Sequence, residues 1–330
     1  MPKILISVVI PTYNSAATLK YCLSSLKTQS MREQLEIIVV DGGSSDATLT
    51  IAQNYGAKII KNPQRLPEPA KLIGLFAARG KYICFLDSDE ALINKNQLQQ
   101  RHEFFASCPQ VKMITLDYCQ PNANLSIHSL YTNQYGDPFT LFLWGSKAFS
   151  NVERYRRNLV KRANNWHIFS HQVGTTYVVA DSGSTTFECG LLKEQANKGG
   201  SIVSAVAAYA QKYPYFGIIT ADVVDHNPHL SLRLYLQKLK FRVINNVHYP
   251  QQAGFAVRAK SFSRYKAYLF LLYCLLPFWP IFDTLILIAK NQRLGFAYHL
   301  VYTYYLFITI GWQMGRKIFH LPPKINSYGK

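Results

Sequence analysis

The segment KYICFLDSDEALI, from Lys81 to Ile93, determines how the rest of the chain is interpreted. Tyr82 to Leu86 is a short apolar run with residues that favour β-structure, so it predicts a buried strand. Carboxylates follow the run directly, and in open α/β sheets ligands bind beyond the carboxyl ends of strands. Asp87 and Asp89 carry hard oxygen donors that suit Mg²⁺ or Mn²⁺. The segment therefore predicts a site for a divalent cation and a diphosphate.

Asp89 also has a simpler interpretation, as the N-cap of a helix that follows it. Two earlier polar turns favour the ligand site. Pro11-Thr12-Tyr13-Asn14 ends the apolar run from Ile4 to Ile10, and Asp41-Gly42-Gly43-Ser44-Ser45-Asp46 ends the run from Glu36 to Val40. If the three runs are strands of one sheet, their turns lie along the same edge. On its own, the second turn could simply lead into a helix capped by Ser45 or Asp46.

The order of elements predicts a doubly wound α/β fold. A helix with apolar residues at helical spacing starts after Ser15, a further strand covers Ala57 to Ile60, and helices separate the strands. The chain has no glycine-rich dinucleotide motif between strand and helix and no Walker lysine motif, which disfavours dinucleotide binding and P-loop chemistry.

The motifs PTYN, DGGSSDAT and FLDSDE, in this order and spacing, resemble the family 2 glycosyltransferases of the GT-A fold. The resemblance covers residues 4 to 115 and extends more loosely to about residue 245. It implies a GT-A type α/β fold, with a mixed, mostly parallel, Rossmann-like sheet flanked by helices. The glycosyltransferase domain would span residues 1–250, with a donor half at about 1–115 and an acceptor half at about 116–250. Residues 251–330 would form a membrane-associated helical region.

The resemblance also implies a nucleotide-sugar donor. Its binding residues would be Pro11, Thr12, Tyr13 and Asp41 at the nucleoside, with Asp87 and Ser88 at the diphosphate. Asp87 and Asp89 match the pair that holds Mg²⁺ or Mn²⁺. Lys71 stands where relatives often carry arginine, and Leu72 replaces the usual asparagine, so Lys71 would meet a phosphate as a point charge. A strand from Ile218 to Val224 precedes His226, which matches a third metal ligand in the family; a histidine at such a place can also be an ordinary surface or core residue.

The catalytic base stays unassigned. The segment from Asp181 to Phe187 resembles the strand that lines the acceptor side, after which relatives usually carry a carboxylate. Aligning the helix expected at Ser201 to Lys212 leaves Ser204 near that position. Asp181, Glu188 and Asp222 are the remaining candidates. Residues 130–149 look like an insertion that shapes an acceptor cleft, or else a packed hairpin.

The chain is strongly basic, with 36 Lys and Arg against 18 Asp and Glu in 330 residues, a formal charge of +18. Such an excess suits phosphate-bearing partners. The basic cluster between Arg154 and Arg162 is a solvated face or a contact for anionic lipid. Without a recognisable nucleic-acid module, we expect no nucleic-acid partner. The scattered cysteines indicate reduced thiols, and the short apolar run at the start is not typical of a secretory signal.

The composition changes after Arg264. Ala267 to Ala289 contains a single charge, Asp283, and is long enough to span a bilayer, although Pro277 and Pro280 would kink it. Phe296 to Trp312 is a second, shorter apolar segment. A transmembrane hairpin, helices lying in one leaflet and a buried helical core are all open; membrane association is favoured because both segments are apolar nearly all round. Basic residues on both outer flanks predict a plasma (inner) membrane protein with its catalytic domain on the cytoplasmic side.

These features together predict an enzyme that transfers a sugar from a nucleotide-sugar to a lipid-linked or cell-surface glycan acceptor, at the lipids of the membrane. The divalent cation would neutralise the leaving diphosphate. One alternative is a polyprenyl-phosphate glycosyltransferase, because an attacking phosphate needs little help from a base. An alternative of another class is a non-catalytic, membrane-bound protein that binds nucleotide-sugars.

Overall fold

The computed structural model describes residues 3–120, 124–145, 150–171, 184–248, 264–321 and residue 323. The contacts group the chain into two units. The first comprises Met1–Gln120 and Tyr155–Pro228, and the second Pro121–Arg154 and His229–Lys330. The boundary predicted near residue 250 divides a glycosyltransferase domain from a membrane-associated region. It is a functional division, which differs from these contact-based units, and it stays a prediction.

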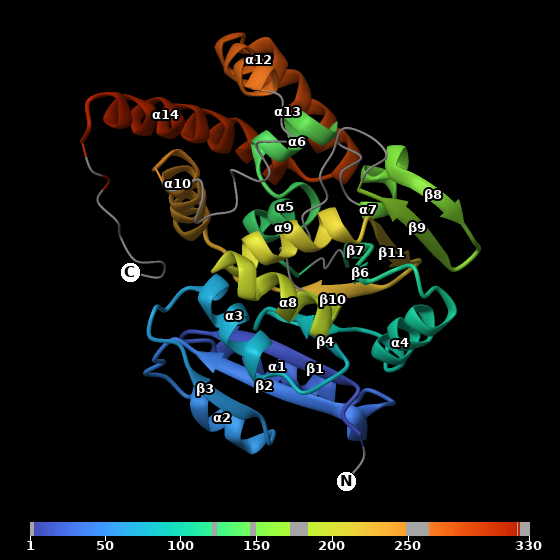
Figure 1. Ribbon diagram of the computed structural model, residues 1–330. Coiled ribbons are helices and arrows are strands. Elements are labelled where there is room, and N and C mark those ends of the chain that lie inside the picture. Colours follow the sequence, from blue (N-terminus) through green and yellow to red (C-terminus); the bar gives the residue numbers. More distant parts are fainter. Residues whose placement is uncertain are drawn as a thin grey trace. The chain divides into compact units, whose positions relative to one another are not determined.

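The first unit is built on a mixed sheet, which Figure 1 shows with helices packed against it. Within the described residues nine strands take part, in the order β3-β2-β1-β4-β10-β6-β11-β9-β8. β10 runs antiparallel to both of its neighbours, and β9 runs antiparallel to β11 and β8. The mixed sheet flanked by helices that the resemblance implies is confirmed, whereas adjacent strands pair antiparallel as often as parallel. The strand bounds are β1 Ile6–Thr12, β2 Leu35–Asp41, β3 Lys58–Lys61, β4 Tyr82–Phe85, β6 Met113–Thr115, β8 Leu159–Arg162, β9 Trp166–Ser170, β10 Thr185–Glu188 and β11 Tyr215–Ile219.

The core of this unit forms because the central strands are apolar throughout. Val8 and Ile10 of β1 pack with Leu19 and Leu23 on one face of the sheet, where all four side chains are buried. On the helix α3, Gly74 lies so close to β1 that an added Cβ would sit 2.2 Å from Val9 Cγ1. The lack of a side chain at Gly74 therefore allows this close helix–strand packing. The helices of the unit are α1 Ala16–Lys27, η1 Arg32–Gln34, α2 Thr48–Asn54, α3 Pro67–Ala77, α4 Gln97–Ser107, η3 Arg156–Asn158, α8 Cys189–Gly199 and α9 Ile202–Lys212.

A small sheet of β5, β12 and β7 lies in the same unit (Glu90–Leu92, Val223–His226 and Tyr118–Cys119). The strand β5 begins directly after Asp89, so the interpretation of Asp89 as a helix N-cap is wrong. The single strand predicted from Ile218 to Val224 is also wrong. It is divided between β11 and β12, and Ala221 between them has a φ of 63° in the left-handed region.

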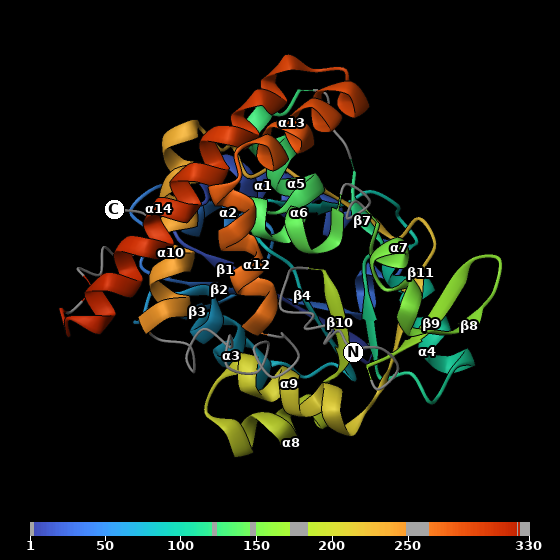
Figure 2. The same cartoon turned by 90° about the horizontal axis from the view of Figure 1, so that it is seen from above.

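The second unit is helical. In the part of the chain that the structure describes it contains α5 Ile127–Tyr135, α6 Pro138–Trp144, α7 Asn151–Arg154, α10 Leu232–His248, α12 Arg264–Leu275, α13 Phe278–Asn291, η4 Leu294–Ala297 and α14 Tyr298–Ile318. Helix α14 packs along α10, as Figure 2 shows. A buried aromatic cluster joins them to α5 through Tyr131, Tyr235 and Tyr302. The described part of residues 130–149 thus contributes to two packed helices of this unit, α5 and α6.

The predicted membrane segments differ from a straight span. Among the described residues, no single helix is both long and apolar enough to cross a bilayer. Tyr268–Leu275 and Phe278–Asn291 meet the length and composition requirement only as a pair, and the chain bends by 87° between them. The bend falls at Pro277, which lacks the N–H that a continuous helix requires.

Candidate active site

The first two polar turns meet at the carboxyl ends of β1 and β2. Thr12 Oγ1 donates to Asp41 Oδ1 at 3.0 Å, and the backbone N–H groups of Gly43 and Ser44 each donate to Asp41 Oδ2 at 2.8 Å. The Ser44 hydroxyl donates to the same carboxylate. Asp41 is buried. Its carboxylate therefore holds the DGGSSD turn in shape, a role that comes in addition to any contact with a ligand.

Further hydrogen bonds join the PTYN turn to the DGGSSD turn. The backbone N–H of Asn14 donates to Ser44 Oγ at 2.8 Å, and that of Ser45 donates to Asn14 Oδ1 at 2.9 Å. Ser15 occupies the N-cap position of α1 but makes no side-chain cap bond; Asp46 Oδ2 accepts from Ala16 N at 3.0 Å in its place. The cap of the first helix is thus supplied by the turn after the second strand.

Tyr13 and Arg65 lie side by side beyond this edge. The guanidinium carbon of Arg65 is 5.8 Å from the centroid of the Tyr13 ring. Gly42 lies beneath them, because a Cβ there would come within 3.2 Å of Arg65 Cα and 3.4 Å of Tyr13 Cδ2. Among the predicted nucleoside-binding residues, Tyr13 thus borders a cationic side chain. The sequence motifs do not predict Arg65 as a site residue, because it lies between the motifs in a loop with no recognisable pattern.

Lys71 on α3 reaches the third turn. Its Nζ lies 3.0 Å from Asp87 Oδ1, and the Lys71 side chain is 10% exposed against 39% for Asp87. Burial lowers the pKa of Lys71, but the charge of Asp87 and its hydrogen bond more than offset this effect, so the pKa of Lys71 is raised. The ammonium group stays charged and faces the first carboxylate of the Asp-Ser-Asp segment. Ser88, between the two aspartates, donates to Ser15 Oγ at 3.1 Å and so connects this turn to the PTYN turn.

His226 reaches the second carboxylate of the same segment. It lies at the end of β12, opposite Glu90 of β5, and its Nε2 is 3.4 Å from Asp89 Oδ2. Burial lowers the pKa of His226, but the carboxylate of Asp89 raises it well above the ordinary histidine value. The structure therefore brings Asp87, Asp89 and His226 to one place, as the resemblance implied.

Glu90 is a further acid of this site that the sequence argument did not use. It is buried, and its Oε2 accepts from the backbone N–H of Asp87 at 3.0 Å. Burial first, and the neighbouring Asp87 charge second, raise the pKa of Glu90 to about 7. The sequence shows that Glu90, an acid, directly follows the Asp-Ser-Asp segment. Only the pairing of β5 with β12 shows that the Glu90 side chain is buried.

The donor set can be compared with the needs of a divalent cation. No group of three His, Cys, Asp or Glu side chains within the described residues is arranged to enclose a metal ion by itself. Mg²⁺ is usually held by one or two carboxylates together with waters and substrate phosphates, not by an all-protein cage. Asp87 and Asp89, both partly exposed, fit that kind of site, with His226 beside them as a nitrogen donor.

Of the three candidates for the catalytic base, the structure describes Glu188 and Asp222. Glu188 pairs in register with Tyr82 at the start of β4, at the opposite edge of the sheet from Asp87, and it forms an ion pair with Lys112 at 3.0 Å. Three residues of strand separate the two edges, about 10 Å, so Glu188 is wrong as a base for this site. Asp222 is buried and paired with Arg101, which assigns it to the framework. Asp181 lies outside the described residues.

Comparison with known proteins finds the family that the motifs resemble. The family model described as "Glycosyl transferase family 2" matches residues 7–171. The minor teichoic acid biosynthesis protein GgaA of Bacillus subtilis is 35% identical over 120 residues, which cover 33% of this chain and 27% of that protein. The GalNAc(5)-diNAcBac-PP-undecaprenol beta-1,3-glucosyltransferase of Campylobacter jejuni is 33% identical over 116 residues, which cover 32% of this chain and 37% of that protein. The chain thus matches well under two thirds of the length of these relatives.

A solved structure shares the fold over most of the chain. The mannosyltransferase PcManGT from Pyrobaculum calidifontis has a TM-score of 0.54 and 15% identity, and the match covers 96% of this chain and 88% of that one. With the family model matching half of the chain, and with the motifs at one edge of a GT-A-like sheet, the chain belongs to glycosyltransferase family 2. Membership of this family favours an enzyme over the non-catalytic binding protein.

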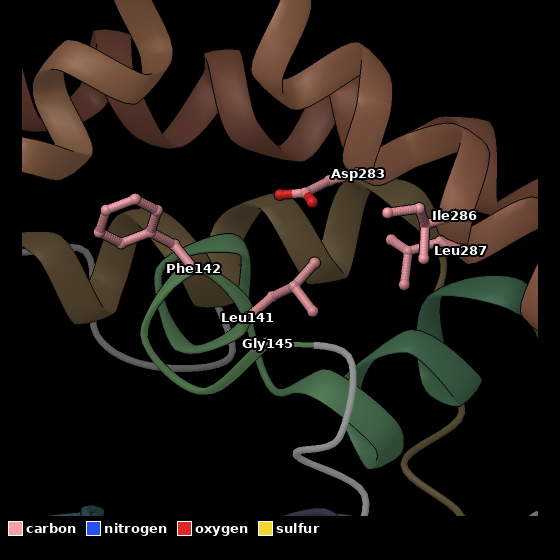
Figure 3. A pocket seen from close by; sticks show the side chains of 6 residues that line it. All are labelled: Leu141, Phe142, Gly145, Asp283, Ile286 and Leu287. Carbon is pink, nitrogen blue, oxygen red and sulfur yellow. The ribbon is translucent and has the colours of Figure 1, made fainter.

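The second unit has a small cavity of its own, of about 140 Å³. Figure 3 shows Leu141, Phe142 and Gly145 on one side of it and Asp283, Ile286 and Leu287 of α13 on the other. The carboxylate of Asp283 accepts a hydrogen bond from Tyr273 at 2.8 Å. The single charge of the apolar segment therefore has a protein partner and lines a cavity.

Proposed function

We propose that the enzyme transfers one sugar from a nucleotide-sugar, bound with a divalent cation, to a lipid-linked or cell-surface glycan at the membrane. The observation that carries the proposal is the meeting of three turns at one edge of the sheet. There, Asp41 holds the turn that is proposed to bind the nucleoside. Asp87 faces Lys71, and Asp89 faces His226. Ligands of α/β sheets bind at such an edge.

Each part of the donor has residues of suitable chemistry. The Tyr13 ring and the turn around Asp41 offer a flat face and hydrogen-bonding groups to a nucleoside. Lys71 offers a fixed positive charge to the diphosphate. Asp87, Asp89 and His226 would hold the cation, Mg²⁺ or Mn²⁺, which neutralises the charge of the leaving diphosphate. The mannosyltransferase of the same fold was solved in complex with GDP-Man and Mn²⁺, which supports this proposal.

The acceptor is proposed from the relatives. One is named for teichoic acid biosynthesis and the other for a glycan on a PP-undecaprenol carrier. Both names point to envelope glycans, and the second to a lipid-linked one. The net charge of +18 suits acceptors that carry phosphate.

We further propose that the bend between α12 and α13 sits in one leaflet of the plasma membrane, on the cytoplasmic side. Six neighbouring apolar side chains around the bend are between 37% and 63% exposed: Leu275, Leu276, Phe278, Trp279, Ile281 and Phe282. A patch of this kind is costly in water and is typical of an interaction surface. Asp283 does not oppose such seating, because its carboxylate is bonded to Tyr273.

A polyprenyl-phosphate acceptor is the second candidate. It is favoured by the placement of Glu188 at the opposite edge of the sheet and of Asp222 in a buried ion pair. A phosphate oxygen is already a nucleophile at neutral pH, so this reaction needs little help from a carboxylate base.

The test has two stages. A thermal-shift screen of UDP-, GDP- and dTDP-sugars with and without Mn²⁺ should identify the donor, since a ligand of the folded state raises the melting temperature. Transfer of that sugar is then measured to a diphosphate-linked polyprenyl glycan and to polyprenyl phosphate in parallel. Transfer to the glycan alone supports the first candidate and transfer to the phosphate alone the second. Donor binding with transfer to neither would overturn both acceptor assignments.

A further inference from the structure

The two aspartates of the Asp-Ser-Asp segment face different side chains, which come from different elements. Lys71 of α3 lies 3.0 Å from Asp87, and His226 of β12 lies 3.4 Å from Asp89. Asp87, a predicted ligand of the divalent cation, is therefore already paired with a positive charge of the chain. Any cation that binds Asp87 must share that carboxylate with the ammonium group of Lys71.

Lys71 has little freedom to withdraw into solvent. It is 8% exposed as a residue, whereas the Asp87 side chain is 39% exposed. Moving the ammonium group of Lys71 away from Asp87 would separate a buried charge from this counter-charge, which is costly. A donor diphosphate beside Asp87 would supply such a partner, because its oxygens accept hydrogen bonds from an ammonium group.

We propose that Lys71 acts as a built-in counter-ion that competes with the divalent cation for Asp87, so that the cation binds tightly only together with the donor diphosphate. Lys71 is then a positioning residue that couples two binding events. The proposal rests on the proposed use of a divalent cation at Asp87 and Asp89. It adds an order to that use: the protein without nucleotide has low affinity for the metal, and the nucleotide raises it.

The strength of the competition can be bounded. Two unit charges about 4 Å apart near a protein surface interact strongly enough to change a binding constant by about tenfold or more. A divalent ion doubles the effect. Replacing Lys71 by a neutral side chain of similar length should therefore tighten Mn²⁺ binding to the nucleotide-free protein by about tenfold or more.

The experiment measures Mn²⁺ binding to the full chain by electron paramagnetic resonance, in which bound Mn²⁺ loses the signal of the aqueous ion. Titrations use Mn²⁺ alone and Mn²⁺ with UDP or GDP. The variants are Lys71→Met, Lys71→Arg and Lys112→Met. Lys112 is a matched control, because its Nζ also lies 3.0 Å from a carboxylate, that of Glu188 at the opposite edge of the sheet.

We expect Lys71→Met to bind Mn²⁺ alone about tenfold or more tightly than wild type, and to gain less from the nucleotide. Lys71→Arg, which keeps the charge, and Lys112→Met should behave like wild type. Adding Asp87→Asn to Lys71→Met should remove the gain. Far-ultraviolet circular dichroism confirms folding, and Lys71→Gln replaces Lys71→Met if that variant is unfolded.

The possible outcomes distinguish the competition by Lys71 from the cation site at Asp87 and Asp89 on which it depends. If wild type binds Mn²⁺ with UDP or GDP but Lys71→Met binds Mn²⁺ alone no better than wild type, the competition is overturned and the cation site stands. If no protein binds Mn²⁺ with either nucleotide, the cation site itself is overturned, and this inference with it.

Discussion

The guanidinium group of Arg101 donates from Nε and Nη2 to the two carboxylate oxygens of Asp222, at 2.7 and 2.9 Å. Both side chains are almost fully buried, with 0% and 1% exposed. Arg101 also donates to the carbonyl oxygen and the hydroxyl of Ser184 and to the hydroxyl of Thr186. One side chain of α4 thus ties the start of β10 to the turn after β11.

Removing Arg101 should destabilise the protein strongly. Breaking a buried ion pair by deleting one partner leaves a buried charge uncompensated, which costs about 3–5 kcal/mol. We expect Arg101→Met to lower the free energy of unfolding by this amount, as measured by urea denaturation. The control is Lys198→Met, which removes an exposed partner of Glu194 and should have no measurable effect. An Arg101→Met protein as stable as wild type would show that Asp222 needs no partner.

Asp41→Ala should weaken both the turn and the binding of the donor. The carboxylate accepts from Thr12, Gly43 and Ser44, and removing it leaves those groups without their acceptor. Losing hydrogen bonds to a charged group costs about 1.5–3 kcal/mol, so we expect a donor dissociation constant raised by roughly tenfold or more. Calorimetry measures the constant, with Ser44→Ala as a milder control that keeps the carboxylate. A destabilised Asp41→Ala protein with unchanged donor affinity would limit Asp41 to a structural role.

Asp89→Asn should leave the fold intact and remove the Mn²⁺-dependent part of donor binding. The amide keeps the shape of the side chain but loses the negative charge that faces His226 and that would hold the proposed cation. Donor affinity is measured with and without Mn²⁺, and sugar transfer alongside. Glu188→Gln, at the opposite edge of the sheet, is the matched control and should keep wild-type values. A folded Asp89→Asn protein with the same response to Mn²⁺ would exclude Asp89 as a ligand.

His171 should make the protein less stable in acid. Its ring is buried against Phe216, with 4.7 Å between centroids, and within the described residues neither ring nitrogen has a hydrogen-bond partner. Burial lowers the pKa of His171 to about 4, against an ordinary value of about 6.5. The unfolded chain therefore binds the proton more tightly, and the stability is complete above pH 6.5 and lost as the pH falls towards 4.

The size of this effect is about 3 kcal/mol, because each unit of difference in pKa is worth about 1.4 kcal/mol. In urea denaturation at several pH values, wild type should lose about 3 kcal/mol more stability between about pH 7 and pH 4 than His171→Phe. His229→Phe, at an exposed histidine, should keep the wild-type slope. Equal slopes for wild type and His171→Phe would mean that His171 is protonated without cost in the folded protein.

The apolar bend should hold the protein on lipid. Helices α12 to α14 contribute buried residues to the core of the second unit, among them Phe270, Leu287 and Tyr302. Removing the tail would therefore damage that unit, and point substitutions test the surface better. We expect the combined change Leu275→Ser, Phe278→Ser, Trp279→Ser and Phe282→Ser to abolish co-sedimentation with anionic vesicles in high salt.

The control for this prediction removes exposed apolar side chains of the first unit. Phe76 and Ile93 are 47% and 45% exposed, and Phe76→Ser with Ile93→Ser should leave vesicle binding unchanged. If the wild-type protein itself washes off vesicles with salt, basic residues alone account for the binding, and the bend has no role in lipid.

The part of the site that the sequence predicted correctly consists of strand ends. β1, β2 and β4 are short apolar runs followed by polar turns, so their parallel pairing brings residues such as Thr12 and Asp41 together. The helix predicted to start after Ser15 is confirmed as α1, because its apolar residues recur at helical spacing.

The rest depended on contacts between distant segments. The pairing of β5 with β12 places Glu90 opposite His226. Neither strand has a sequence pattern that predicts its partner. Glu188 was misplaced because its position follows from the antiparallel direction of β10, which alternation of side chains does not specify. Asp222 was a candidate base in the sequence, and its partner Arg101 lies 121 residues away, so sequence patterns do not show the buried pair.

The hydrogen bonds between the PTYN and DGGSSD turns also bear on the thermodynamics of donor binding. The backbone N–H groups of Asn14, Ala16, Gly43, Ser44 and Ser45 are already bonded to side chains of these turns. A nucleoside that binds there meets preorganised backbone, so little conformational entropy is left to lose. The affinity for the base can then come from few contacts, because the turns lose little entropy when they bind it.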